Sequence, residues 1–229
     1  QLLPQAIREA ALSFPINTGL GADNIAPRAI ARLSEAALLA LIVLFLAFER
    51  LGRWTEVLNL VLIVLLPKPD GGRRPIGLFP TLIRIWMRAR LYAARAWEIT
   101  NHSDAIFAGP GMGAQKAAWQ ASFAAEAAAL GGQHHAQALL DLVKAFESIP
   151  HHVLAWAAKA KGYPMALLRL SLAAYRLLRA VGVDGVFSRL VQATRGITAG
   201  SGFATVELKV IMRDLVVMLE ARWASILAV

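Results

Sequence analysis

The longest uninterrupted run of apolar residues, positions 36–48, sets the first limit on what this chain can form. It contains thirteen residues, whereas a helix that crosses a membrane needs about 18–20. Composition makes the comparison necessary, because 57% of the residues are hydrophobic and the mean hydropathy is +0.52. We therefore expect a helix inside a protein core and no membrane partner, with a small membrane-associated protein as the alternative that hydropathy supports.

A second apolar segment predicts a β-hairpin. Residues 60–66 are rich in Val, Ile and Leu, which favours a buried strand. The sequence PKPDGGRR follows at residues 67–74, and its Pro-Asp-Gly-Gly core is a strong turn signal. Residues 75–78 can then return as the second strand, so that basic residues flank the tip of the hairpin.

The rest of the chain predicts mostly helices, which gives a helix-rich α+β fold. Helices are expected over residues 27–51, 80–98, 114–130, 150–161, 164–179 and 203–223, with one helical turn at 144–148. A short strand is expected at 136–142, a ribbon at 181–194 that turns at Asp184-Gly185, and a glycine-bearing loop at 196–202. No repeat or linker marks a domain boundary.

Positive charge is concentrated in one part of the sequence. The net charge is +9, and seven basic residues stand against the single acid Asp70 between positions 68 and 95. In a helix, Arg84, Arg88 and Arg95 would fall within about 40° of one another. Such a stripe is either a solvated helix face or a surface that contacts phosphate.

Asp141 is the first candidate for chemistry. An isolated carboxylate at the end of an apolar strand is costly to bury unless it pairs or binds a metal, although it could also cap the following turn. Other sites are less well supported. The adjacent pairs His134-His135 and His151-His152 point their side chains apart and make no ready zinc site, and Ser201 lacks the placed partners of a nucleophile. The tryptophans are expected to pack in the core.

Four segments, in order along the chain, resemble motifs of reverse transcriptases of the non-LTR retrotransposon and group II intron type. ALLDLVKAFESIPHHVL at 138–154 resembles the first catalytic motif of that family. The other three are LPKPDGGRRPIGLFP at 66–80, IFAGPGMGAQKAAW at 106–119 and RGITAGSGFAT at 195–205. The resemblance extends to TGLGADNIAPRAI at 18–30 and covers most of the chain.

The resemblance implies a right-hand polymerase fold, with fingers and an N-terminal extension in residues 1–135 and a partial palm in residues 136–229. It implies an RNA-directed DNA polymerase, and hence an RNA template, a DNA primer and deoxynucleotides as partners. The sequence does not determine the compartment; an intracellular location, the nucleus included, is the expectation. The absence of cysteine leaves the redox compartment open.

By the same resemblance, Asp141 is the catalytic ligand of Mg²⁺, and the backbone carbonyl of Leu142 is a second oxygen for the metal. Phe146 is implied as a steric gate whose ring lies where a ribose 2′-hydroxyl would sit. A phenylalanine that packs in the core is the alternative.

The resemblance also assigns roles in binding. Lys68 and Arg74 would hold the charge of the triphosphate or the template, for which a guanidinium offers a planar fork of donors. Gly200 would let the backbone approach the nucleotide closely, although a glycine at the start of a helix is the plainer explanation. The residues implied for template binding are Arg73, Arg84 and Arg88.

Departures from the family pattern limit the activity expected of this chain. Two-metal nucleotidyl transfer needs carboxylates from two strands, and in the family a pair of adjacent aspartates follows an aromatic residue. None of the fifteen acidic residues here is adjacent to another. Ala199 also replaces the usual glutamine, and Glu147 the usual aspartate. We therefore expect an inactive piece of a longer polymerase, or alternatively a non-catalytic, basic nucleic-acid-binding remnant.

Overall fold

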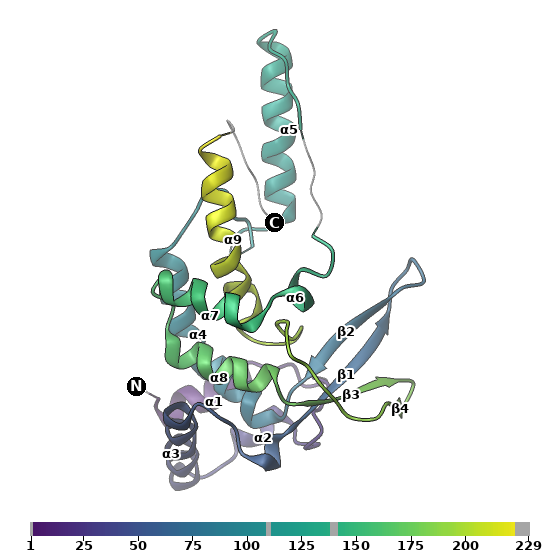
Figure 1. The fold of residues 1–229 in the computed structure, drawn as a ribbon. Coiled ribbons are helices and arrows are strands. Elements are labelled where there is room, and N and C mark those ends of the chain that lie inside the picture. Colours follow the sequence, from purple (N-terminus) through teal and green to yellow (C-terminus); the bar gives the residue numbers. More distant parts are fainter. Residues whose placement is uncertain (1, 109–110, 138–141, 223–229) are drawn as a thin grey trace.

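Helices and one small sheet make up the fold, which confirms the predicted helix-rich α+β class (Figure 1). The computed structural model describes residues 2–108, 111–137 and 142–222, and about 52% of the chain is helical. The helices are α1 Pro4–Leu12, α2 Pro27–Ile30, α3 Glu35–Leu51, α4 Thr81–Thr100, α5 Ala114–Leu130, α6 Ala145–Ser148, α7 His151–Ala160, α8 Met165–Tyr175 and α9 Ala204–Glu220, with a 3₁₀ turn at Glu56–Leu58.

Local signals set the limits of α3. The Ser34 hydroxyl accepts a hydrogen bond from the Ala37 amide at 3.3 Å, which caps the first turn. The helix ends at Leu51, and Gly52 caps it with a left-handed backbone, φ of 67°, that suits glycine. The prediction of one helix over residues 27–51 is wrong, because α2 ends after four residues and Ser34 starts a separate helix.

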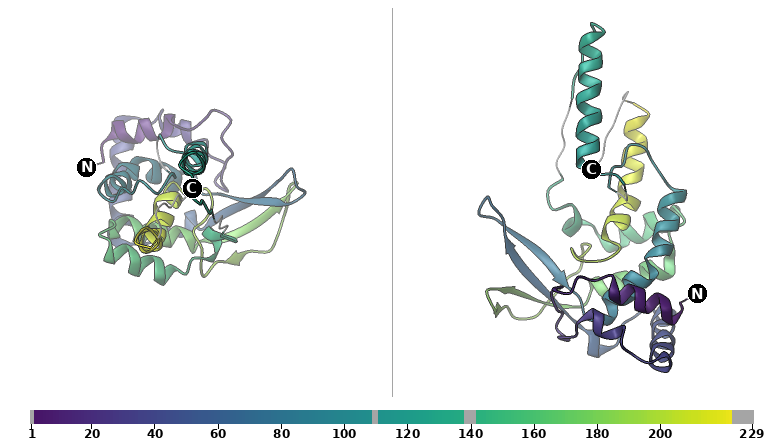
Figure 2. Two further views of the ribbon diagram at one scale, coloured as in Figure 1. Left: turned by 90° about the horizontal axis from the view of Figure 1, so that it is seen from above. Right: turned by 180° about the vertical axis from the view of Figure 1, so that it is seen from behind.

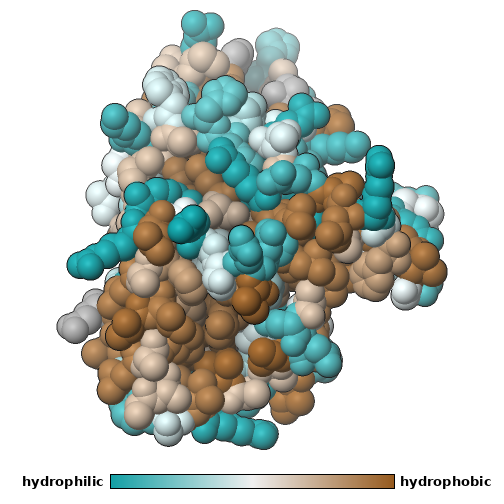
Figure 3. All heavy atoms as spheres, turned by 60° about the horizontal axis from the view of Figure 1, so that its bottom comes forward, coloured by the Kyte–Doolittle hydropathy of each residue, from teal (hydrophilic) through white to brown (hydrophobic). Residues whose placement is uncertain are grey.

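The expectation that the apolar run of α3 is buried holds for only one side of the helix. The buried residues are Leu38, Leu41, Ile42 and Phe45, and the large exposed ones are Leu39, Val43, Leu44 and Leu46. The i, i+3, i+4, i+7 spacing of the buried set places them on one stripe that faces the core. Apolar side chains also gather on the lower face of the molecule, where the N-terminal helices lie (Figure 3). Among the described helices, none has both the length and the apolar character needed to cross a bilayer.

A mixed sheet joins segments from the two halves of the chain. Its strands are β1 Leu60–Pro67, β2 Arg73–Leu78, β3 Leu178–Val183, β4 Val186–Phe187 and β5 Val191–Gln192. The order is β2-β1-β3-β4, and β5 also pairs with β3. The predicted hairpin is confirmed as antiparallel β1 and β2, and the ribbon turns at Asp184-Gly185 as predicted.

The parallel pairing of β1 with β3 was not predicted from sequence. It places Ile63 opposite Val181. This pairing explains an error in the predicted helix over residues 164–179. The helix α8 ends at Tyr175, and Leu178 and Arg179 already belong to β3 because they pair with β1. The sheet thereby ties the hairpin to the C-terminal part of the chain.

The strand expected at residues 136–142 cannot be compared in full, because residues 138–141 lie outside the described part of the chain. The described residues on either side, 136–137 and 142, are not in a strand. The helical turn and the helix expected after it are confirmed as α6 and α7.

One apolar core runs from Leu2 to Val210 and includes residues from both the expected fingers and the expected palm. Trp86 is at its centre, with edge-on contacts to Trp54 at 5.4 Å and Phe203 at 5.5 Å between ring centroids. The expected burial of tryptophans is therefore right for Trp54, Trp86 and Trp97. It is wrong for Trp119 and Trp156, which are exposed, and Trp223 lies outside the described residues.

The helix α5 projects from the rest of the molecule, as the view in Figure 1 and the view from behind in Figure 2 show. Ala117 is its one buried residue. Trp119 and Phe123, one turn apart, are 77% and 73% exposed. The predicted bounds of this helix, residues 114–130, are confirmed.

Candidate functional site

Three of the motif-like segments meet around one cavity of about 230 Å³, which we call the sheet hollow. Ile63, Pro75 and Gly77 line it from β1 and β2. Glu147 lines it from α6 and Arg179 from β3, and the segment before α9 contributes Ala193 and residues 195–199. Segments that are far apart in the sequence thus form a single concave surface.

The glycine loop, residues 195–203, is held between the sheet and α6 by backbone hydrogen bonds. The Gly77 amide donates to the Ala199 carbonyl at 2.6 Å, which attaches the loop to β2. On the other side, the Ile197 amide donates to the Phe146 carbonyl and the Gly196 amide to the Ile149 carbonyl, both at 2.8 Å. The loop is therefore a fixed wall of the hollow.

The close contact at Gly200 is with the protein itself. Its φ is +105°, a conformation that favours glycine, and a Cβ there would overlap the carbonyl oxygen of Gly77. A Cβ on Gly77 would in turn lie 2.5 Å from the Thr198 methyl group. The approach of β2 thus explains why Gly200 must be a glycine, while its contact with a nucleotide stays a prediction.

Arg179 and His151 brace the loop, and sequence reasoning missed both roles. The Arg179 guanidinium donates to Thr198 Oγ1 and to the Tyr175 carbonyl, each at 2.8 Å, and burial lowers the pKa of Arg179. His151 Nε2 lies 3.0 Å from the Gly196 carbonyl, while Arg176 Nε donates to Nδ1 at 3.3 Å. Burial lowers the pKa of His151, which suits a neutral ring with its proton on Nε2.

The cations of the hairpin are available to a ligand. Arg73 and Arg74 are exposed and Lys68 is partly exposed, all at or beside the turn between β1 and β2. Within the described residues, their side chains have no hydrogen-bond or ion-pair partner. Arg195 is likewise exposed at the rim of the sheet hollow. These four residues could bind phosphate without breaking an internal contact.

Arg84 and Arg88, by contrast, contact the N-terminal segment. Their guanidinium carbons lie 4.9 and 4.7 Å from the centre of the Phe14 ring, within the range of a cation–π contact. Arg84 also donates to the Gly19 carbonyl at 2.7 Å, and burial lowers its pKa. The expected basic stripe is therefore occupied in part by structural contacts. A role of Arg84 and Arg88 in template binding stays a prediction.

The residues proposed for the metal and the nucleotide sugar are placed only in part. Asp141 lies outside the described residues, and Leu142 is 50% exposed. Phe146 is partly buried and packs against the core, so its role as a gate stays a prediction. No group of three or more His, Asp or Glu side chains in the described part of the chain could hold a metal ion. The Mg²⁺ site stays a prediction.

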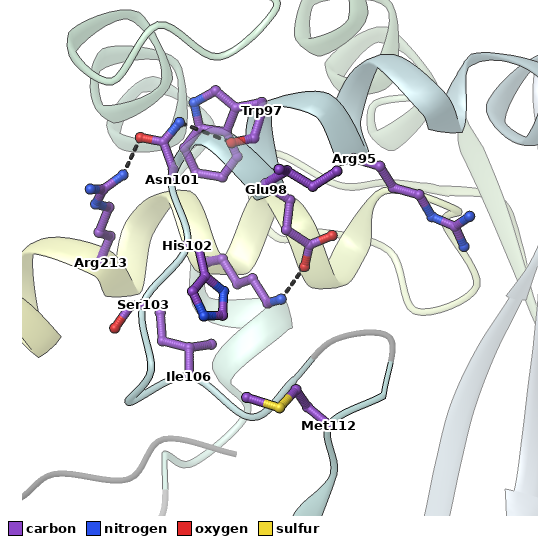
Figure 4. A pocket seen from close by; sticks show the side chains of 11 residues that line it. Arg95, Trp97, Glu98, Asn101, His102, Ser103, Ile106, Met112 and Arg213 are labelled. Atoms are coloured by element: carbon purple, nitrogen blue, oxygen red, sulfur yellow. Dashed lines mark hydrogen bonds and ion pairs between the residues drawn. The ribbon is translucent and has the colours of Figure 1, made fainter.

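A second hollow of about 270 Å³ lies where the end of α4 meets α9 (Figure 4). Most of its polar groups pair with each other. Lys209 of α9 forms an ion pair with Glu98 of α4. Arg213 of α9 donates to the side-chain oxygen of Asn101, the residue that follows α4. In Figure 4 the Arg95 side chain extends away from the other residues. We assign these contacts to the packing of the two helices.

A scan of protein-family models gives no match to the chain, and a search of curated proteins gives no significant match. The assignment of a function therefore depends on the residues and on the geometry that brings them together.

Proposed function

We propose that the chain is the fingers and partial palm of an RNA-directed DNA polymerase and that it binds nucleic acid at the hairpin and the sheet hollow. One observation carries the proposal. The segments at 66–80, 138–154 and 195–205, which resemble three separate motifs of one polymerase family, each contribute residues to the same hollow. A chance likeness of isolated segments would not require them to meet in space.

The charges of the site suit a polyanion. Lys68, Arg73, Arg74 and Arg195 are free to contact phosphate, and an arginine can hold two phosphate oxygens with its planar fork. In the full-length polymerase, the primer 3′-hydroxyl would release its proton to solvent, its oxygen would form a bond to the α-phosphorus of a deoxynucleotide, and pyrophosphate would leave. Mg²⁺, held by Asp141 and the Leu142 carbonyl, would neutralise the developing phosphate charge.

Replacing Lys68, Arg73 and Arg74 together with alanine tests the interface. We expect weaker binding to an RNA–DNA duplex, because up to three phosphate contacts are removed. If all three contacts form, the slope of log affinity against log salt should fall by about 2.7, using about 0.9 per phosphate as for duplex DNA. Fluorescence anisotropy over a series of salt concentrations measures this slope.

The matched control replaces Arg32, Arg53 and Lys159 with alanine. These residues are exposed and lie outside the hairpin. Because each triple variant removes three positive charges, the net charge changes equally in both. We expect the control to keep the wild-type slope. If both triple variants lose the same slope, binding follows overall charge and the proposed interface is wrong.

Primer extension with this chain alone should give no product, because none of its acidic residues is adjacent to another. The assay uses an RNA template, a DNA primer and Mg²⁺. Magnesium-dependent synthesis would contradict the requirement for a paired carboxylate. Binding without synthesis also fits a non-catalytic remnant. A downstream reading frame that encodes an aromatic-x-Asp-Asp sequence would distinguish the polymerase from that remnant.

A further inference from the structure

A buried cluster of polar side chains lies directly behind the glycine loop. Glu207 in α9 is fully buried, and so is Tyr175 in α8. The Tyr175 hydroxyl lies 2.5 Å from Glu207 Oε2 and 2.7 Å from Ser201 Oγ. Ser201 belongs to the glycine loop, so these three side chains form a continuous chain of hydrogen bonds from α9 to the wall of the sheet hollow.

The direction of this chain depends on one proton. Tyr175 has a single hydroxyl proton and cannot donate to both neighbours. If Glu207 is ionised, Tyr175 donates to the carboxylate and Ser201 donates to Tyr175. If Glu207 is protonated, its own hydroxyl can donate to Tyr175, which then donates to Ser201. The Ser201 proton is then free to turn towards Met87 Sδ, which lies 3.8 Å away.

Ser201 passes this change to the backbone of the loop. Its Oγ accepts a hydrogen bond from the Phe203 amide at 3.2 Å, at the entry to α9. Its own amide donates to the Thr198 carbonyl at 3.0 Å. A reorientation of the Ser201 hydroxyl therefore changes the lone pair that Oγ presents to the Phe203 amide, within the residue whose own amide bonds to Thr198.

We propose that Glu207, Tyr175 and Ser201 act as positioning residues that transmit the protonation state of Glu207 to the glycine loop. The inference deepens the proposed function, because the loop is a wall of the proposed nucleic-acid site. Within the described residues, no cation contacts Glu207, and its Oε1 has no hydrogen-bond partner. Burial raises the pKa of Glu207 to about 7, which places the change within the physiological range.

The tyrosines and the serine next to Glu207 do not change protonation state near pH 7. Burial raises the pKa of Tyr163 and of Tyr175, so both stay neutral near pH 7. Ser171 of α8 is buried nearby, and its hydroxyl favours the ionised form of Glu207. The hydroxyl does not meet the distance and angle limits of a hydrogen bond. Two other charged residues of α9 form ion pairs with groups other than Glu207. Lys209 pairs with Glu98 of α4, and Asp214 pairs with Lys161, which follows α7.

His151 of α7 is a further titratable group near Tyr175. Its ring centroid lies 6.3 Å from that of Tyr175, and burial lowers its pKa. The side chain also contacts the loop at Gly196. An experiment must therefore separate the titration of Glu207 from that of His151.

The test compares wild type with Glu207→Gln, Tyr175→Phe and Tyr163→Phe at pH 6 and pH 8. Infrared spectroscopy follows the carbonyl band of the protonated Glu207 side chain, and hydrogen exchange corrected for intrinsic rates follows the Ser201 and Phe203 amides. In wild type, we expect the carbonyl band at pH 6 to fade at pH 8. We expect the protection of the two amides to change by roughly tenfold, which corresponds to coupling of one pKa unit.

Each variant has a distinct expected result. Glu207→Gln should lose both the band and the pH response of the amides, while Tyr175→Phe should keep the band and lose the response. Tyr163→Phe is the matched control, because the Tyr163 hydroxyl has no hydrogen-bond partner among the described residues, and it should behave as wild type. Equal pH responses in wild type and Glu207→Gln would assign the effect to another group, such as His151, and overturn the inference.

The same samples separate this inference from the proposed function. Duplex affinity is measured at both pH values. A loop that responds to Glu207 while the protein binds no duplex at either pH would contradict the proposed function and leave the inference standing. Duplex binding together with amides that do not respond to pH would contradict the inference and leave the proposed function standing.

Discussion

Wild-type protein should lose about 3 kcal/mol of unfolding free energy, relative to Glu207→Gln, as pH rises from about 4.5 to 7. Burial raises the pKa of Glu207 from 4.5 to about 7. In this range the folded protein holds a proton that the unfolded chain releases. The stabilisation is fully present below pH 4.5 and is lost as pH rises through 7. Urea denaturation over a pH series measures the difference.

The comparison with Glu207→Gln removes the contributions of other groups. Glutamine has almost the same shape and does not titrate, so that the titration of His151 appears equally in both proteins and cancels. Because burial lowers the pKa of His151, that residue acts with the opposite sign and destabilises the folded protein as pH falls. Parallel curves for the two proteins would show that Glu207 is solvated or already ionised in the folded state.

Replacing Gly200 with alanine should destabilise the protein by about 2–4 kcal/mol. The φ of +105° is strained for alanine, and the new Cβ would overlap the Gly77 carbonyl. The loop must then move away from β2, which strains the hydrogen bond from the Gly77 amide to the Ala199 carbonyl. We expect weaker duplex binding as well, because the wall of the sheet hollow is displaced. Chemical denaturation and anisotropy measure the two effects.

Gly113→Ala is the matched control for Gly200→Ala. Gly113 has an extended backbone with φ of 165°, and a Cβ there meets no atom within 4 Å. We expect a change in unfolding free energy below about 0.5 kcal/mol. If Gly200→Ala is as stable as this control, the loop does not approach β2 as closely as described.

Local sequence signals predicted much of the secondary structure. The Pro-Asp-Gly-Gly turn predicted the hairpin correctly, because the conformational preferences of these residues act within four positions of the chain. The glycines at 113 and 131 bracket an alanine-rich segment, and α5 has the predicted bounds. The predictions failed where distant contacts decide, as at the end of α8, where Leu178 joins β1 instead of extending the helix.

The candidate site was predicted less completely than the secondary structure. The resemblance selected the hairpin and the glycine loop, which do meet at the sheet hollow. It did not select Arg179 or His151, because nothing in their local sequence shows that they brace a loop. It did not assign a role to Arg195 either, although a cation as the first residue of the glycine loop was a signal that could have identified it.

The sequence by itself determined the helix-rich class, the hairpin with its exposed cations and the short apolar run of α3. These follow from turn chemistry, side-chain period and charge, which act between near neighbours along the chain. Only the tertiary structure decided that β1 pairs with β3, that Arg84 and Arg88 cover Phe14, and that Glu207 is buried behind the glycine loop. Each of these depends on which of many distant segments packs against a given residue, and local preferences do not encode that choice.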